Sequence, residues 1–569
     1  MPADRRDRNE YRVDPDDIGS AANGELVAAE YLPARRYGPP RVRIVERLGQ
    51  PDVPGAISLL SIAAFDIPSE FPAAALAEAA AANPPDPVGR TDLRDLALVT
   101  IDGSDARDFD DAVWAEPDPD PTNRGGWRLV VAIADVAFYV TPGSALDHEA
   151  EWRGNSVYFP DRVVPMLPEA LSNGLCSLMP GEDRACLAAH LWIDAQGRKL
   201  RHRFDRAIMR SAARLTYEQV QAARDGGPAL AIDRDRLDVL YGAWAALDRS
   251  RQARGALALD LTEYRVVLDA RRNPIAVQPH TRLDSHRLIE EFMILANVAA
   301  AEELEARRRP CVYRVHDAPD PERLDGLRQT LIDLGVPGLA LAKGQALRPE
   351  LFNRILERAA GRPEAAMIND LVLRAQAQAA YSPHNIGHFG LALRRYAHFT
   401  SPIRRYADLL VHRALLSEPV ATGEELAAIA EHISSTERRA TAAERAALDR
   451  YRVRLCSGMI GQVFSARVSG VVRFGLFVRI ADSGTDGLIP LSNLPVGPYR
   501  FDPKRQRLTA RHNRRGFGLG DAVTVRLVEA DPIGGRLVFT LEIEGTRPSP
   551  KSSSKPPTRR RAPSRRRRR

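Results

Sequence analysis

Residues 100–111 read Thr-Ile-Asp-Gly-Ser-Asp-Ala-Arg-Asp-Phe-Asp-Asp and place five aspartates within ten positions. The apolar run Leu96–Ile101 leads into this acidic loop and predicts a strand. A second apolar run, Trp127–Asp135, predicts another buried strand. Because sites in open sheets tend to lie at the carboxyl ends of strands, we expect the acidic loop at the edge of a buried sheet.

The aspartates of this loop are the strongest chemical signal in the chain. They are Asp102, Asp105, Asp108, Asp110 and Asp111. Two like charges about 4 Å apart repel by about 4 kcal/mol near a protein surface, so converging carboxylates favour a divalent cation such as Mg²⁺ or Mn²⁺. An EF-hand is excluded because Ala106 and Arg107 fall at ligand positions. The alternative is a solvated acidic turn, and spacing alone leaves both readings open.

A second motif lies far away in sequence, at Tyr396–Tyr406 (YAHFTSPIRRY). Thr400-Ser-Pro predicts a turn and an N-cap, with Pro402 in the first turn of a helix. Arg404 and Arg405 would then lie near the positive end of that helix, where a phosphate is attracted. Taken alone the motif is weak, since surface helices often begin with arginines.

The rest of the chain divides into a helical part and a β-rich part. Helical patterns predict helices at 364–380 and 424–455, and after Gly458 short apolar runs alternate with glycines. Five such runs predict a small barrel of the oligonucleotide-binding (OB) kind. They are 459–468, 475–480, 487–490, 522–527 and 536–541. Phe474 and Phe477 suit stacked bases, at about 1–3 kcal/mol each, although core packing would explain one of them equally well.

Length, composition and cysteine content narrow the class of protein. A chain of 569 residues with 44% hydrophobic and 27% charged residues predicts several globular domains. No stretch approaches the ~18 apolar residues of a membrane span, and the charged residues 1–17 do not resemble a signal peptide. The four cysteines show no metal-binding or disulfide spacing. We therefore expect a cytoplasmic enzyme or binding protein that does not enter a membrane.

The net charge is concentrated in the last residues. The chain carries +7, of which residues 547–569 contribute +11, which leaves −4 for the residues before them. This tail is too polar to bury a core, so we expect it to be disordered. Its cations could bind RNA or ribosomes non-specifically by releasing counterions from phosphates. The alternative is a solvated tail without a dedicated partner.

Several stretches together carry a resemblance to a known family. They are TIDGSDARDFDDA (100–112), NSVYFPDRVVPMLP (155–168), LSNGLCSL (171–178), RLIEEFMILAN (287–297) and GHFGLALRRYAHFTSPIRRYADL (387–409). Over roughly residues 40–545 the chain resembles the ribonuclease R family, within the ribonuclease II superfamily of exoribonucleases. Long motifs in one order make coincidence an inadequate explanation.

The resemblance implies an α+β fold. A large mixed α/β RNB catalytic domain would occupy 66–455, and an all-β OB-fold barrel of the S-one type would follow at 456–545. A partial cold-shock-like β segment would occupy 1–65, and the basic tail 546–569. The family normally carries two cold-shock barrels, so the short N-terminal segment indicates either a natural short form or a misplaced start.

The resemblance also implies an activity: processive 3′-to-5′ hydrolysis of single-stranded RNA to nucleoside 5′-monophosphates by a monomer that uses Mg²⁺, with Mn²⁺ as an alternative. The implied metal site consists of Asp102, Asp108, Asp110 and Asp111. Asp110 would be the most activity-sensitive of them, and Arg404 would hold the phosphate near the scissile bond. RNA would be bound by Tyr158 and Glu290 at the last nucleotide, by Glu444 near the terminal nucleotides, and by Phe474 and Phe477 in the barrel.

Each implied role has an ordinary alternative. Tyr158 could be core, and Glu290 could form a solvated pair with Glu291. Three histidines, His388, His398 and His412, are better explained as structural hydrogen-bonding groups than as metal ligands. Leu259 stands where the family carries an aromatic, so we expect a weaker grip on the terminal bases. At the level of the whole protein, a non-catalytic RNA-binding regulator and a metal-dependent DNA exonuclease are the competing functions.

Overall fold

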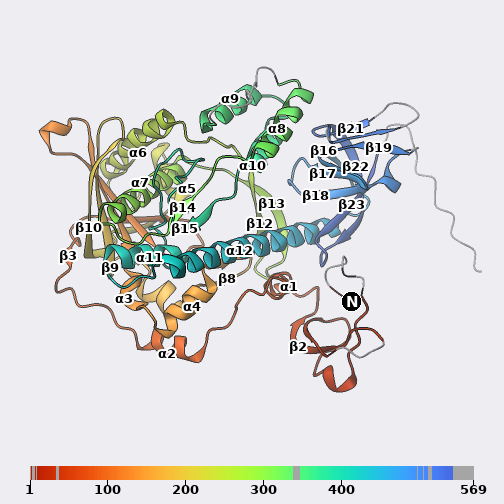
Figure 1. Ribbon diagram of the computed structural model, residues 1–569, viewed down its shortest axis with the longest axis horizontal. Coiled ribbons are helices and arrows are strands. Elements are labelled where there is room, and N and C mark those ends of the chain that lie inside the picture. Colours follow the sequence, from red (N-terminus) through yellow and green to blue (C-terminus); the bar gives the residue numbers. More distant parts are fainter. Residues whose placement is uncertain are drawn as a thin grey trace, which may run out of the picture.

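The largest sheet among the described residues, here called the central sheet, is mixed and seven-stranded, and Figure 1 shows it on the side of the molecule away from the C-terminal barrel. The structure is a computed structural model and describes residues 2, 7, 9–33, 38–336, 347–495, 498–503, 505–510 and 516–542. In spatial order the strands are β11 (Ala213–Thr216), β4 (Val99–Asp102), β5 (Asp111–Pro117), β6 (Trp127–Ala134), β9 (Asp183–Ile193), β10 (Lys199–Arg210) and β3 (Thr91–Asp92). The outer pairs β11–β4 and β10–β3 are parallel and the inner pairs antiparallel. Both strands predicted beside the acidic loop are confirmed.

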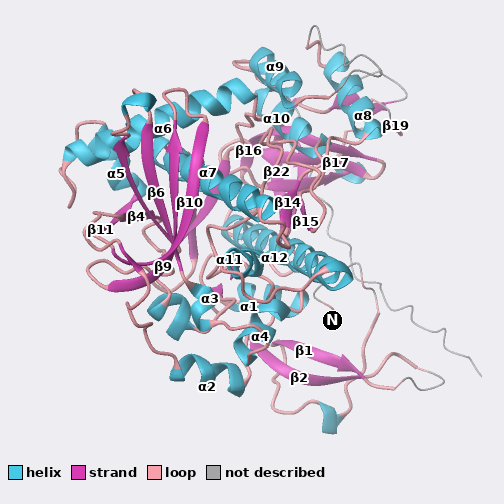
Figure 2. Cartoon of the chain, turned by 60° about the vertical axis from the view of Figure 1, so that its left-hand side comes forward, coloured by secondary structure: helices cyan, strands magenta, loops and turns pink. Residues whose placement is uncertain are grey.

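Both faces of this sheet are buried, which explains the unbroken apolar run of β6. Val130 and Val131 point to opposite faces and are each 0% exposed. One face packs against α5 (Tyr217–Arg224), α6 (Arg234–Arg254) and α7 (Asp284–Ala306). The other packs against α2 (Ala73–Ala81), α3 (Val136–Tyr139), α4 (Ala145–Arg153) and α11 (Tyr406–Leu415). Figure 2 shows the twisted sheet with these helices around it.

Helix α12 (Gly423–Ser457) runs from the central sheet to the C-terminal barrel (Figure 1). A separate small core is formed by α8 (Pro321–Asp333), α9 (Pro349–Ala359) and α10 (Ala365–Ala375). The helix predicted at 364–380 ends earlier than expected, at Ala375. The chain then becomes extended and forms β15 (Ala380–Ser382), which pairs with β14 (Tyr313–Val315). Two further pairs are β7 (Val157–Tyr158) with β8 (Val163–Val164), and β12 (Glu263–Leu268) with β13 (Pro274–His280).

The C-terminal strands close into a barrel, as predicted. The barrel consists of β16 (Val463–Val472), β17 (Gly475–Ile480), β18 (Asp486–Pro490), β23 (Arg536–Leu541) and β22 (Ala522–Asp531). A three-stranded sheet of β19 (Tyr499–Asp502), β20 (Arg507–Ala510) and β21 (Gly516–Gly518) was not predicted, because its short strands are rich in arginine and glycine.

The N-terminal part contains a two-stranded sheet, β1 (Leu26–Tyr31) and β2 (Val42–Gly49), followed by α1 (Ala56–Ala64). The basic tail at 546–569 lies outside the described residues, and the domain boundaries stay predictions. Among the described residues, no helix is both long and apolar enough to span a bilayer.

Candidate active site

The acidic loop connects two neighbouring strands at one edge of the sheet. Strand β4 ends at Asp102, and β5 begins at Asp111. Between them Phe109 is buried in the core, its N–H donates to the Ser177 hydroxyl, and that hydroxyl donates to the carbonyl of Arg107. These contacts hold the loop against residues 171–178, which is one of the stretches that carry the family resemblance.

Asp110 joins the acidic loop to the second motif. Its side chain is 4% exposed, Oδ1 accepts a hydrogen bond of 2.9 Å from the Ile403 N–H, and Oδ2 lies 3.5 Å from Nε of Arg404. The Asp110 carbonyl also accepts from the N–H of Ala134 at the end of β6. Two motifs almost 300 positions apart in sequence therefore meet at one carboxylate.

The second motif differs from its prediction in where the helix begins. Helix α11 starts at Tyr406 with Arg405 as N-cap, so Pro402 precedes the helix instead of lying in its first turn. The cause is Asp408, which accepts from the Ser401 N–H (2.8 Å) and from Arg405 (2.7 and 2.9 Å) and so holds 400–405 as a loop. Arg405 is thus neutralised by Asp408, whereas the Arg404 side chain is 42% exposed.

A cavity of about 240 Å³ lies between the acidic loop, α7 and the 400–405 loop. Its polar lining includes Asp102, Asp108, Asp110, Asp111, Glu290 and Arg404. Tyr217 and Asn297 also line it and were missed by sequence reasoning. Tyr217 had no local signal: it reaches the cavity because β11 runs parallel to β4 with Thr216 opposite Asp102, a pairing that only the tertiary structure shows.

The electrostatics of the cavity disfavour four free carboxylates. Burial, together with the charges of Asp110 and Asp108, raises the pKa of Asp102 to about 7. Burial and the charge of Asp102 raise the pKa of Asp111 to about 8. Burial also raises the pKa of Asp110 well above its ordinary value, although Arg404 opposes the shift. A bound cation would remove this penalty.

The donor set fits a divalent cation. Asp102 and Asp110 each have a buried Oδ2 that makes no hydrogen bond within the described part of the chain, and hard oxygen ligands suit Mg²⁺. The side chains do not yet converge: no group of three or more His, Cys, Asp or Glu among the described residues is arranged around one point. Two of the carboxylates are instead engaged by protein groups: Asp110 accepts from Ile403 and Asp108 from Tyr158.

Tyr158 stands beside this acidic group on the β7–β8 hairpin. Its hydroxyl donates to Oδ2 of Asp108 (3.1 Å), its N–H donates to Oε1 of Glu444 on α12 (2.7 Å), and it is 39% exposed. The neighbours Val157 and Phe159 are buried instead. Tyr158 is therefore not a core residue: the hairpin places its hydroxyl beside Asp108 and its backbone beside Glu444 of α12.

Glu290 and Glu291 have different environments although they are adjacent. Glu290 lines the cavity and forms an ion pair with Arg282. Glu291 is 3% exposed and is bound by Arg251 at 2.8 Å and Arg254 at 3.5 Å. The alternative of a solvated pair is wrong for Glu291, because α7 turns that side chain toward α6.

The remaining candidates lie elsewhere. Phe474 and Phe477 are on the barrel, 59% and 37% exposed, with ring centroids 6.4 Å apart and nearly perpendicular. Neither belongs to the barrel core, which takes Leu476 and Val478 from the same strand. The ring nitrogens of His388, His398 and His412 hydrogen-bond to Leu391, Tyr381 and Phe399, as structural histidines do.

Comparison with known proteins identifies the family. Residues 90–418 match the RNB domain family, 1–72 the cold shock domain and 458–542 the S1 RNA binding domain. Ribonuclease R of Escherichia coli (strain K12) is 40% identical over 567 residues, which cover 95% of this chain and 69% of the relative. The chain belongs to the ribonuclease R family. The predicted α+β fold with a cold-shock segment and a C-terminal barrel is thereby confirmed.

A solved structure of this family agrees with the fold. Ribonuclease R of Mycoplasma genitalium, in complex with ribose-methylated single-stranded RNA, superposes with a TM-score of 0.89 at 30% identity and covers 95% of this chain and 86% of its own. Yeast Ssd1, a pseudonuclease, is 18% identical with a TM-score of 0.68, which shows the shared fold alone. Ribonuclease R enzymes are 3′-to-5′ exoribonucleases, and this chain is a member of that enzyme class.

Leu259, where the resemblance led us to expect an aromatic side chain, has a clear structural position. Leu259 packs against the small core of α8–α10, and the chain around it is held by side-chain amides: Ala258 donates to Asn353 and Asp260 to Asn369. An aliphatic side chain at this position extends a hydrophobic core.

Proposed function

We propose that this chain is a magnesium-dependent, processive exoribonuclease that hydrolyses single-stranded RNA from the 3′ end to nucleoside 5′-monophosphates. One observation carries the proposal: four aspartates, Glu290 and Arg404 line the same cavity of about 240 Å³ in a chain of the ribonuclease R family. A regulator without catalysis would have no need of buried, mutually repelling carboxylates beside an exposed arginine.

The residues divide the work by charge. Asp102, Asp108, Asp110 and Asp111 would hold divalent cations, which in such sites activate water and stabilise the leaving oxygen. Arg404, exposed beside Asp110, would neutralise charge on the phosphate at the scissile bond. The terminal nucleotides would be held by Tyr158, Glu290 and Glu444, and RNA farther from the cut by Phe474 and Phe477.

Further properties belong to the same proposal. Carboxylate donors suit both Mg²⁺ and Mn²⁺, and we propose Mg²⁺, as the family resemblance implies, with Mn²⁺ as an alternative. The four cysteines are buried and free, which fits a reducing cytoplasm. We propose a monomer, and a tail that binds RNA or ribosomes through its charge alone.

A single assay tests the activity. The protein is incubated with 5′-labelled single-stranded RNA and with DNA of the same sequence, in Mg²⁺ and in EDTA. We expect RNA to pass directly to one very short labelled product with release of monophosphates, and no reaction in EDTA. Bound but intact RNA in Mg²⁺ would instead favour the regulator, and equal shortening of DNA would favour a DNA exonuclease.

A further inference from the structure

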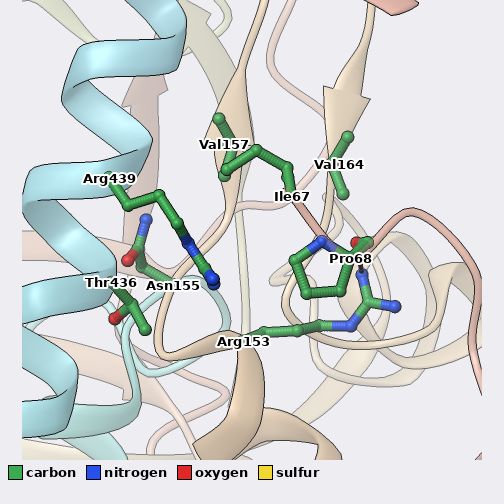
Figure 3. Close-up of a pocket in the computed structure, with 8 residues that line it drawn as sticks. All are labelled: Ile67, Pro68, Arg153, Asn155, Val157, Val164, Thr436 and Arg439. Carbon is green, nitrogen blue, oxygen red and sulfur yellow. Dashed lines mark hydrogen bonds between the residues drawn. The ribbon is translucent and has the colours of Figure 1, made fainter. Parts of the chain in front are cut away.

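The hairpin that carries Tyr158 rests on the helix that precedes the central domain. Figure 3 shows Ile67, just after α1, beside Val157 and Val164 of the two hairpin strands. The space left among these residues is about 10 Å³, which is about the smallest volume that admits one water molecule. Next to these apolar side chains, the Arg153 guanidinium of α4 donates a hydrogen bond to the carbonyl of Pro68. The underside of the hairpin is therefore tightly packed.

A buried carboxylate fixes the tip of the same hairpin. The Asp161 side chain is 0% exposed, and its Oδ1 accepts a hydrogen bond from the Ser58 hydroxyl of α1. The Ser58 oxygen lies 3.2 Å from the Tyr451 hydroxyl of α12. The other carboxylate oxygen accepts from Nε and Nη2 of Arg162, both at 3.1 Å. Asp161 thus links the hairpin to two helices that are almost 400 positions apart.

The backbone of α1 approaches this tip as closely as a glycine permits. Gly55, the N-cap of α1, has φ of +87°. A Cβ added there would lie 2.6 Å from Nη2 of Arg162 and 3.1 Å from Oδ2 of Asp161. A larger residue would be strained by this positive φ and would displace the Arg162 guanidinium from its contact with Asp161. The contact between α1 and the hairpin is therefore a close, specific fit.

We propose that Asp161 is a positioning residue, which couples α1 to the grip on the 3′-terminal nucleotide by holding Tyr158 beside Asp108. The proposal rests on the proposed function, since it assumes that Tyr158 contacts that nucleotide. Helix α1 lies within residues 1–72, which match the cold shock domain, so this module would act on the active site through the hairpin as well as through any contact of its own with RNA.

A positioning role predicts a particular division between binding and chemistry. Asp161 is buried behind the hairpin, with both oxygens engaged by protein groups, so it does not touch RNA or the metal site. Its loss would let the hairpin tip move, and Tyr158 would lose its fixed orientation. RNA affinity should therefore fall more than the single-turnover cleavage rate at saturating RNA.

The test is a double-mutant cycle on the full chain with a short fluorescent single-stranded oligoribonucleotide. Affinity is measured by anisotropy in EDTA, and cleavage is measured in Mg²⁺. Asp161→Ala should weaken binding about threefold to tenfold, part of the ~1–3 kcal/mol of one stacked base. In a Tyr158→Ala background the same change should have no further effect. Asp161→Asn keeps an oxygen that accepts from Ser58 but replaces the acceptor of Arg162 with an NH2 group, so it should recover part of the binding lost in Asp161→Ala.

Two further variants keep the outcome clear. Ser434→Ala removes another buried hydroxyl from α12, one that accepts from Tyr381, and should leave RNA affinity unchanged. If Asp161→Ala fails to fold, Ser58→Ala enters the same cycle. Equal losses of affinity with and without Tyr158 would overturn the positioning role. If Tyr158→Ala alone binds normally, the role assigned to Tyr158 is wrong and the proposal ends with it, whereas cleavage of RNA in Mg²⁺ still tests the function separately.

Discussion

Asp110 combines three features of this site in one carboxylate: it is buried, it contacts the 400–405 loop, and it faces Arg404. It is 3% exposed, one oxygen is held by Ile403, and the other faces Arg404 without a hydrogen bond within the described residues. Burying such a charge without a full set of partners is costly, which supports the proposal that a cation binds here. The high pKa of Asp110 has the same physical origin.

Asp110→Asn should therefore reduce RNA cleavage at least ~10²-fold, as expected when a metal-binding carboxylate is lost, while RNA affinity stays within severalfold. Removing one negative charge eases repulsion of the phosphate, so binding has no reason to collapse. The measurements are single-turnover cleavage in Mg²⁺ and anisotropy in EDTA. Asp105→Asn is the matched control in the same loop, because Asp105 is 70% exposed and pairs with Arg265; its activity should be nearly unchanged. A joint loss of binding and cleavage in Asp110→Asn would contradict the assigned role.

The 400–405 loop and α11 show how one buried ion pair determines the path of an element. Asp408 is 0% exposed and holds both the Ser401 N–H and the Arg405 guanidinium. On its far side the loop packs on residues 154–156, where the Ser156 N–H donates to the carbonyl of Arg404. Of the two neighbouring arginines, Arg405 pairs with the buried Asp408, and Arg404 remains exposed.

Asp408→Ala should destabilise the protein by about 3–5 kcal/mol, since it leaves the Arg405 charge buried and unpaired. Cleavage should fall as well, because Arg404 and the Ile403 N–H lose their fixed positions, while the acidic residues are untouched. Urea unfolding and single-turnover cleavage measure the two effects. As a control, Asp325→Ala removes an exposed partner of Arg328 on α8 and should cost less than about 1 kcal/mol. Equal losses in the free energy of unfolding for the two variants would contradict the structural role of the Asp408–Arg405 ion pair.

Another buried carboxylate, Asp135, lies at the end of β6 and links this strand to Arg90 and to Arg206 of β10. It binds Nη1 of Arg90 and Nε of Arg206, each at 2.7 Å, and its side chain is 0% exposed. Burial alone would raise the pKa of Asp135, but the hydrogen bonds and charges of Arg206 and Arg90 outweigh it and hold this pKa below its ordinary value.

Asp135→Asn should lower the free energy of unfolding by about 3–5 kcal/mol at pH 7. Because the folded pKa lies below the unfolded value of about 3.9, the stabilisation is fully present above that pH and is lost as pH falls through the folded pKa. The difference between wild type and variant should stay constant from pH 8 to about pH 5 and shrink below about pH 4. Urea unfolding across this range is the measurement, and a difference that grows in acid would contradict the ion pair.

We expect the basic tail to contribute to RNA affinity only through its positive charge. Deletion of residues 547–569 removes eleven Lys and Arg. The slope of log affinity against log salt should become shallower by about 0.7 for each tail cation that contacts single-stranded RNA. RNA affinity measured from low to physiological salt tests this, and the product length should stay the same. An unchanged slope would show that the tail does not bind RNA.

Local sequence determined the elements whose residues supply their own reason. We could predict β4, β6 and the strands of the barrel from the sequence. Strands buried on both faces appear as continuous apolar runs, and strands buried on one face as alternating apolar residues, so the order of the side chains indicates them. The acidic loop and Arg404 could also be identified as candidate functional residues, because their residue types and spacing are local features of the sequence. Only the tertiary structure decided how these parts meet: that Ile403 bonds Asp110, that Arg405 serves Asp408, and that Glu291 faces inward while Glu290 lines the cavity. Ile403 and Asp110 are 293 positions apart, and Glu291 and its partner Arg251 are 40 apart. Even for Arg405 and Asp408, which are only three positions apart, the local pattern does not say which of the two neighbouring arginines will pair with the buried charge.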